Sequence, residues 1–226
     1  MERKIIMNKV DHTLLKETAT WEEIKEVIDD AIKFDVASVC IPPCYVEQAN
    51  YYANGNMKIC TVIGFPNGNN TIQTKVYETR DAIANGAEEI DMVINVGMLK
   101  AKNYDYVQSE IEEIANTCHR TPTISGRPAI LKVIIETCLL TEEEIRKMCK
   151  IVKDAKAEYI KTSTGFSTEG ATKEVIEIMK DEIDKLGGGL LIKAAGGIKN
   201  FDDAETFINI GADRLGTSRL VKELKN

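Results

Sequence analysis

The sequence predicts an α/β fold, a (β/α)8 (TIM) barrel in which residues 1–226 form a single domain. Eight short apolar runs rich in β-branched residues recur along the chain, as expected for buried strands. Amphipathic stretches of helical period separate them. The runs recur about every 28 residues, close to the ~30 residues of one βα unit. This alternation predicts parallel strands joined by helical crossovers, and eight units favour a closed barrel over an open doubly wound sheet.

The expected elements follow one another evenly. The strands are expected at residues 8–12, 37–41, 58–63, 89–94, 129–135, 158–162, 190–194 and 213–217. Thr20 and Thr141, each followed three residues later by a glutamate, fit the capping box that starts a helix, and Asn200 can cap a further helix. Residues 121–128 are expected to form a surface loop. The segment before the first strand leaves little room for another helix.

The composition excludes several classes of protein. Lys and Arg total 29, Asp and Glu total 36, and the net charge is −7; no basic run offers the surface that nucleic-acid binding requires. No segment approaches the ~20 apolar residues that cross a bilayer, and the apolar stretch in the opening MERKIIMNKV is too short for a signal peptide. We therefore expect a cytoplasmic protein that binds neither nucleic acid nor membrane.

The cysteines and histidines do not form a metal-binding pattern. Six cysteines occur without a C-x-x-C pair, and only two histidines are present. Structural zinc sites use closely spaced ligands of these types. We expect reduced thiols, no metal site and no cofactor.

Three lysines lie inside expected strands. Lys132, Lys161 and Lys193 interrupt the apolar runs AILKVIIE, YIKTSTGF and LLIKAAGG. Barrel strands are covered by helices outside and packed side chains inside, so a lysine there is buried in either orientation. Lysine is almost never fully buried without a partner. One interpretation pairs each lysine with an inward carboxylate such as Asp91 or Glu136; the other makes one of them a nucleophile.

Lys161 and Lys193 are expected to be neighbours. If Ile160 and Ile192 face the helices, alternation turns both lysines toward the barrel axis on adjacent strands. Two unit charges ~6 Å apart at an effective dielectric of about 20 repel by roughly 3 kcal/mol, and burial also disfavours a charged amine. An amine that loses its proton can attack a carbonyl carbon. The pair therefore predicts a Schiff-base lysine.

An acid and several small-residue turns complete the pattern. Asp91 alternates with Ile90 and Met92 in the fourth expected strand, where its carboxylate can transfer protons during imine chemistry or serve as a counter-ion for Lys132 or Lys193. Turns at residues 163–165, 195–197 and 216–218 follow the late strands, whose loops often bind phosphate in barrels. Such turns also start ordinary helices. Their coincidence at one end of the barrel favours a monophosphorylated substrate.

These segments together resemble the deoxyribose-phosphate aldolases along nearly the whole chain. The motifs are DHTLLK (11–16), SVCIPP (38–43), TVIGFPNG (61–68), EIDMVINVG (89–97), LKVIIET (131–137), YIKTSTGF (159–166), IKAAGGI (192–198) and RLGTS (214–218). The resemblance implies a class I aldolase that reversibly cleaves 2-deoxy-D-ribose 5-phosphate into D-glyceraldehyde 3-phosphate and acetaldehyde, in the breakdown of deoxyribonucleosides. It implies no metal.

The resemblance also implies roles for individual residues. Lys161 would form the Schiff base, Lys193 would perturb it and assist proton transfer, and Asp91 would be the catalytic aspartate. Supporting residues would be Lys132, Thr164, Asp11 and Cys40, the last two near the mouth of the pocket. The phosphate would be bound by Gly165, Gly196, Gly197, Gly216, Thr217 and Ser218.

Two alternative functions remain open at this point. One is another class I aldolase on a phosphate-binding barrel, acting on a keto sugar phosphate. The other is a noncatalytic sugar-phosphate-binding barrel, although a sensor does not need a costly buried cation pair. In each case the partners are small sugar phosphates or aldehydes, and we expect a homo-oligomer, either a dimer or a tetramer.

Overall fold

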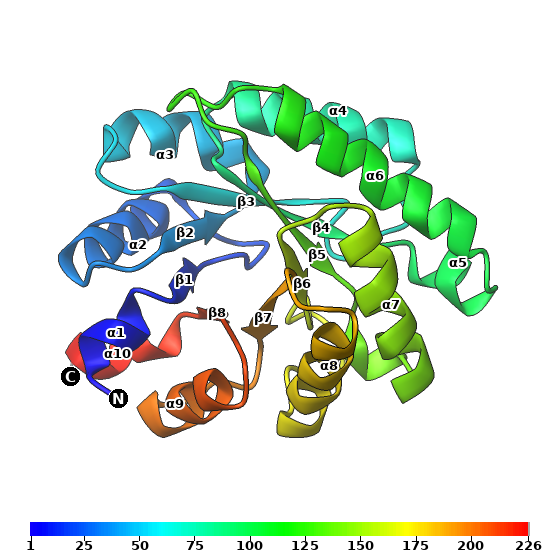
Figure 1. Ribbon diagram of the computed structural model, residues 1–226. Helices are drawn as coiled ribbons and strands as arrows, with labels where there is room; N and C mark the ends of the chain where they lie inside the picture. Colours follow the sequence, from blue (N-terminus) through cyan, green and yellow to red (C-terminus); the bar gives the residue numbers. More distant parts are fainter. Residues whose placement is uncertain (226) are drawn as a thin grey trace.

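In the computed structural model, which describes residues 1–225, the chain forms a closed barrel of eight parallel strands. Each strand pairs with the next along the chain, and the last pairs with the first. The strands lie at the centre and the helices surround them (Figure 1). They are β1 (Val10–Thr13), β2 (Ser38–Ile41), β3 (Ile59–Ile63), β4 (Glu89–Val93), β5 (Ile130–Ile134), β6 (Tyr159–Lys161), β7 (Leu191–Ala195) and β8 (Arg214–Thr217). The predicted (β/α)8 barrel is confirmed.

Helices alternate with the strands and cover the outside of the barrel (Figure 1). The α-helices are α1 (Arg3–Met7), α2 (Trp21–Lys33), α3 (Val46–Ala53), α4 (Ile72–Ala84), α5 (Val96–Lys100), α6 (Tyr104–Arg120), α7 (Glu142–Asp154), α8 (Lys173–Lys185), α9 (Phe201–Asn209) and α10 (Arg219–Lys225). Two short 3-10 helices are η1 (Pro43–Tyr45) and η2 (Thr137–Leu139). None of the helices in residues 1–225 is both long enough and apolar enough to cross a bilayer.

The predicted helix starts are confirmed. Thr20 and Thr141 each form a complete capping box with the glutamate three residues later, so two backbone N–H groups are satisfied at the start of α2 and of α7. The Asn200 side chain accepts a hydrogen bond from the backbone N–H of Asp203 at the start of α9. Local chemistry therefore fixes where these crossover helices begin.

The expectation of little room for a helix before the first strand is wrong. Five residues form α1, because Ile6 and Met7 are buried there against the barrel. The guanidinium of Arg3 lies 4.7 Å from the centre of the Phe201 ring on α9, and it also forms an ion pair with Glu223 on α10. A single helical turn therefore fits between the start of the chain and β1.

A buried ion pair fixes two loops at the carboxyl ends of β3 and β4. The Lys75 ammonium, on α4, donates to the carbonyls of Gly68 and Val93 at 2.8 and 2.7 Å and contacts the Glu110 carboxylate at 2.6 Å. The other Glu110 oxygen accepts from the backbone N–H of Asn95. Burial lowers the pKa of Lys75 and Glu110 opposes that shift, so the ammonium depends on this carboxylate to remain charged.

We expect Glu110→Ala to lower the free energy of unfolding by about 3–5 kcal/mol, because it leaves the Lys75 charge buried without its counter-ion. Urea denaturation measures the loss. Asp184→Ala, which removes one exposed ion pair with Lys180, is the control and should cost at most about 1 kcal/mol. Replacing both buried partners, Lys75→Met with Glu110→Leu, should recover much of the stability. Equal losses in Glu110→Ala and Asp184→Ala would contradict this assignment.

Candidate active site

The barrel interior holds a cluster of charged side chains where barrels usually pack apolar layers. Three carboxylates and four cations belong to this charge cluster, and ion pairs connect all of them. All seven are buried, which is tolerated only when charges are paired. They are Asp11, Glu89, Asp91, Lys132, Lys161, Lys193 and Arg214.

Asp91 is at the centre of the charge cluster. Its Oδ2 accepts from the Nζ atoms of Lys161 and Lys193 at 2.6 and 2.7 Å, and its Oδ1 accepts from Lys132 Nζ at 2.9 Å. Lys161 and Lys193 are register partners on β6 and β7, and Asp91 is the register partner of Lys132. Both amines donate to the same oxygen, so their nitrogen atoms lie close together, as predicted. Asp91 contacts all three lysines, so the counter-ion interpretation holds for each of them.

Asp11 is a second shared counter-ion, and its expected place near the pocket mouth is wrong. It is fully buried, and it does not line the cavity that Lys161 lines at the carboxyl ends of the strands. One oxygen forms an ion pair with Lys193, and the other accepts from Arg214 at 2.6 Å and from the Ser38 hydroxyl at 2.8 Å. Asp11 faces inward from the middle of β1, where cations on β7 and β8 neutralise it.

Mutual pairing keeps most of these groups ionised. Burial favours the neutral acid, but Lys132, Lys161 and Lys193 hold the pKa of Asp91 well below its ordinary value. Burial likewise opposes the charge on Lys193, yet the Asp11 and Asp91 carboxylates raise the pKa of Lys193 above its ordinary value. The same balance raises the pKa of Lys132. The prediction that Lys161 and Lys193 repel each other therefore left out the carboxylate of Asp91, which contacts both lysines.

The charge cluster nevertheless carries one excess positive charge when every member is ionised, because four cations face three carboxylates. Loss of a single lysine proton would make it neutral. Lys132 and Lys193 are fully buried, whereas Lys161 is 3% exposed and is the one member that lines a cavity at the carboxyl ends of the strands. Lys161 is thus the amine of the charge cluster that a molecule in this cavity can reach.

This cavity has a volume of about 240 Å³ and brings together the predicted phosphate-binding residues. Lys161, Thr164, Gly165, Gly196, Gly197, Gly216, Thr217 and Ser218 all line it. Within residues 1–225, the backbone N–H groups of Gly165, Gly196, Gly197 and Ser218 donate no hydrogen bond to the protein. A group of free N–H donors is suited to an anion.

Glycine is required where two of these loops meet. Gly196 has a φ of 75°, and a Cβ atom built on it would lie 2.9 Å from the Cα of Gly170. A Cβ on Gly170 would in turn lie 2.4 Å from the carbonyl carbon of Gly196. The loops after β6 and β7 can therefore approach each other only because neither residue has a side chain.

Other expected residues have different partners from those predicted. Cys40 is fully buried beside Cys60 and Val62 and does not line the cavity, so its expected place near the mouth is wrong. It is the register partner of Cys60, and its thiol lies within 4.8 Å of the Asp91 carboxylate. Among residues 1–225, Glu136 pairs with no lysine; its carboxylate accepts from the Thr164 backbone N–H and hydroxyl at 3.1 and 2.5 Å. The Thr217 hydroxyl already donates to the Ile198 carbonyl.

Two groups of buried side chains bring three potential metal ligands together: Cys40, Cys60 and Asp91, and Asp11, Cys60 and Glu89. Every carboxylate in them already contacts a lysine or arginine cation. Those cations would repel a metal ion. The groups therefore fit ion pairing and do not fit metal binding.

Comparisons with known proteins agree with this geometry. Residues 5–214 match the model of the DeoC/LacD family aldolases. The chain belongs to this family. The deoxyribose-phosphate aldolase of Streptococcus pyogenes serotype M4 (strain MGAS10750) is 53% identical over 226 residues, which cover 100% of this chain and 96% of that protein.

Solved structures of aldolases share the fold of this DeoC/LacD family member. The aldolase QR15 is 37% identical with a TM-score of 0.88, over 97% of this chain and 96% of QR15. The tetrameric deoxyribose phosphate aldolase of Aeropyrum pernix is 26% identical with a TM-score of 0.87, over 100% of this chain and 93% of that one.

Several residues at this aldolase site were missed from the sequence. Glu89 lies two positions before Asp91 and therefore faces the same side of β4. Arg214 opens β8 and contacts both Asp11 and Glu89. Alternation along these strands was a usable signal for both residues. Arg219, at the start of α10, also lines the cavity, and no pattern in the sequence distinguished it from a surface residue.

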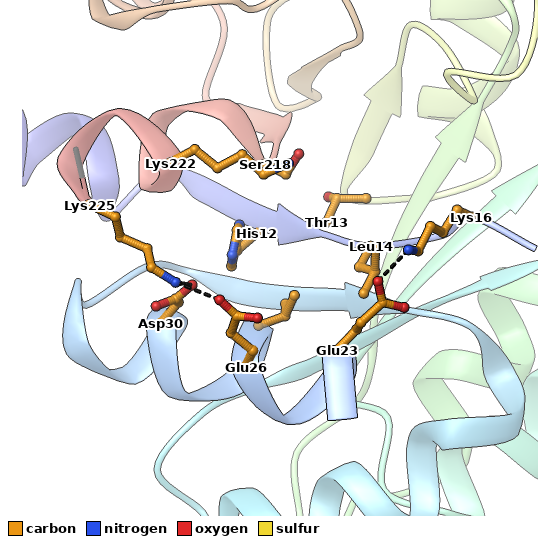
Figure 2. Close-up of a pocket in the computed structure, with 11 residues that line it drawn as sticks. His12, Thr13, Leu14, Lys16, Glu23, Glu26, Asp30, Ser218, Lys222 and Lys225 are labelled. Carbon is orange, nitrogen blue, oxygen red and sulfur yellow. Dashed lines mark hydrogen bonds and ion pairs between the residues drawn. The ribbon is translucent and has the colours of Figure 1, made fainter. Parts of the chain in front are cut away.

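A second and larger cavity, of about 460 Å³, lies between α2 and α10 (Figure 2). His12 lines it from β1, is 3% exposed and has no hydrogen-bond partner at Nδ1 within the described chain. Burial lowers the pKa of His12 to about 4. The imidazole is therefore neutral at pH 7.

We expect this aldolase to lose about 3 kcal/mol of unfolding free energy through His12 as the pH falls from about 6.5 to 4. The pKa of His12 is lower in the folded chain than its ordinary value, so the unfolded chain takes up the proton first and acid favours unfolding. Urea denaturation across this pH range measures the effect. His12→Asn, which does not titrate, should show a correspondingly smaller slope, and an unchanged slope would contradict the assignment.

Proposed function

We propose that this chain is a class I aldolase that reversibly cleaves 2-deoxy-D-ribose 5-phosphate into D-glyceraldehyde 3-phosphate and acetaldehyde. The observation that carries the proposal is the position of Lys161, which is the member of the cationic charge cluster that lines the cavity. Release of one proton neutralises the charge cluster and leaves an amine able to attack an aldehyde. The family and the 53% identical S. pyogenes deoxyribose-phosphate aldolase support the substrate.

The reaction begins when the neutral Nζ of Lys161 attacks C1 of the open-chain sugar. A carbinolamine forms and loses water to give an iminium, which withdraws electrons from the C2–C3 bond. The C3 hydroxyl gives up its proton, the bond breaks, and D-glyceraldehyde 3-phosphate leaves. The remaining enamine is protonated at C2, and hydrolysis releases acetaldehyde and Lys161.

Asp91 and Lys193 are placed to move protons during these steps. Asp91 Oδ2 lies 2.6 Å from the nitrogen that forms and loses the bond to carbon, within the range required of a proton acceptor. Lys193 donates to the same oxygen and keeps a positive charge beside Lys161. Lys132 pairs with Oδ1 and Glu89, so its part is to hold the carboxylate in place.

A relative and the cysteines indicate how the enzyme assembles and where it acts. We infer a homo-oligomer, since an A. pernix relative is tetrameric. We place the enzyme in the cytoplasm, because all six cysteines are free thiols, as is typical of a reducing compartment.

Borohydride added with acetaldehyde should reduce the imine and fix a two-carbon adduct on Lys161, detected by peptide mass spectrometry. Lys161→Met should lose both the adduct and the retro-aldol turnover of deoxyribose phosphate, whereas exposed Lys150→Met should keep both. Turnover in the wild type should survive a chelator. Full activity without modification of Lys161 would rule out the mechanism. Activity confined to dihydroxyacetone phosphate or pyruvate as donor would instead identify a different class I aldolase.

We expect Asp91→Asn to lower kcat by about 100- to 10,000-fold, because the amide cannot accept a proton at the same atom. Steady-state assays of the variant measure this loss. The matched control is Asp81→Asn, a side chain on α4 that contacts Asn85 at the surface, and it should retain wild-type turnover. Near-UV circular dichroism shows whether the variant barrel is folded. A folded Asp91→Asn enzyme with wild-type kcat would exclude Asp91 from catalysis.

A further inference from the structure

We propose that Arg219 is the residue that makes this enzyme selective for a phosphorylated sugar, by pairing its guanidinium with the phosphate dianion. The inference rests on the proposed function, because it assigns one end of that substrate to a side chain. It adds a cation to a site whose other recognisable donors are uncharged hydroxyl and backbone N–H groups.

Arg219 is held next to those donors. It lines the same cavity as Gly165, Gly196 and Ser218, and its backbone N–H donates to the Thr217 hydroxyl oxygen at 3.1 Å. The Arg219 side chain is exposed, and it has no ion-pair partner among residues 1–225. A guanidinium can donate two parallel hydrogen bonds to one phosphate. Arg219 is therefore available for the anion without first breaking an internal salt bridge.

The rest of the cavity offers no other suitable charge. In the described chain, the charged side chains that line it are Lys161 and Arg219, and no carboxylate does so. Lys161 must bond to C1, at the opposite end of the sugar from the phosphate. Phe166 supplies an apolar wall, packed edge-on against Phe65 with ring centres 5.2 Å apart. Arg219 is therefore the cation in this cavity that is available to neutralise the phosphate.

The neighbouring cavity provides a matched control for Arg219. Its carboxylates, Glu23, Glu26 and Asp30, are paired with Lys16 and Lys225 (Figure 2). Ser218 lines both cavities. Lys222, one turn after Arg219 on α10, lines only the second one and therefore provides a matched control of the same charge on the same helix.

The test compares kcat/KM for 2-deoxyribose 5-phosphate and for unphosphorylated 2-deoxyribose. Arg219→Ala should lower the ratio of these two values by about 10- to 100-fold, the effect of one charge-assisted hydrogen-bonded contact, mainly through a higher KM for the phosphorylated sugar. Arg219→Lys should restore part of the ratio. Lys222→Ala should keep the wild-type ratio.

An unchanged ratio in Arg219→Ala would overturn the inference, as would equal losses on both sugars, which would indicate a structural role. Calorimetric titration with glycerol 3-phosphate separates this result from failure of the proposed function. If the enzyme cleaves neither sugar, the proposed reaction is wrong, but weaker glycerol 3-phosphate binding in Arg219→Ala than in Lys222→Ala would still support the anion site. Equal binding by both variants would overturn it.

Discussion

The structure depends on one carboxylate that three lysines share. Asp91 places Lys132, Lys161 and Lys193 around its two oxygens at distances of 2.6–2.9 Å. Without it, Lys161 would lose its one ion pair within residues 1–225, and Lys132 and Lys193 would keep only their ion pairs with Asp11 and Glu89, in a dry interior where charges remain only when they are paired. The barrel makes this possible because β4, β5, β6 and β7 are consecutive neighbours in the sheet. The same contacts that allow the lysines to be buried also position them for chemistry, so stability and reactivity are not separable in this cluster.

Much of the fold could be predicted because its determinants are local. Alternating apolar runs marked all eight strands to within a few residues, and the capping residues Thr20, Thr141 and Asn200 started three helices where expected. Lys161 and Lys193 could be placed side by side because strands alternate with a period of two and consecutive strands of a barrel are adjacent. Helix α1 was missed because its formation depends on burial against the barrel rather than on a strong local pattern.

The balance of charges could not be predicted in the same way. Whether Asp11 lay at the rim or in the interior depended on its distance from Arg214, a residue 203 positions away. The surroundings of Cys40 and Glu136 likewise depended on partners distant in sequence, Cys60 on β3 in one case and Thr164 in the loop after β6 in the other. Only with all seven members of the charge cluster in place does the single excess positive charge emerge. Sequence motifs identify chemical groups, whereas their net electrostatic environment is a property of the closed barrel.

The contact between Arg214 and Asp11 has a consequence for biosynthesis. The arginine lies on β8 and the aspartate on β1, so this ion pair forms only when the last strand is added to the first. A ribosome-bound chain that has not yet released β8 has an open sheet edge, and its Asp11 lacks the guanidinium. Contacts this distant in sequence also form slowly. Closure of the barrel therefore follows the synthesis of β8, and Asp11 gains this counter-ion only at that stage.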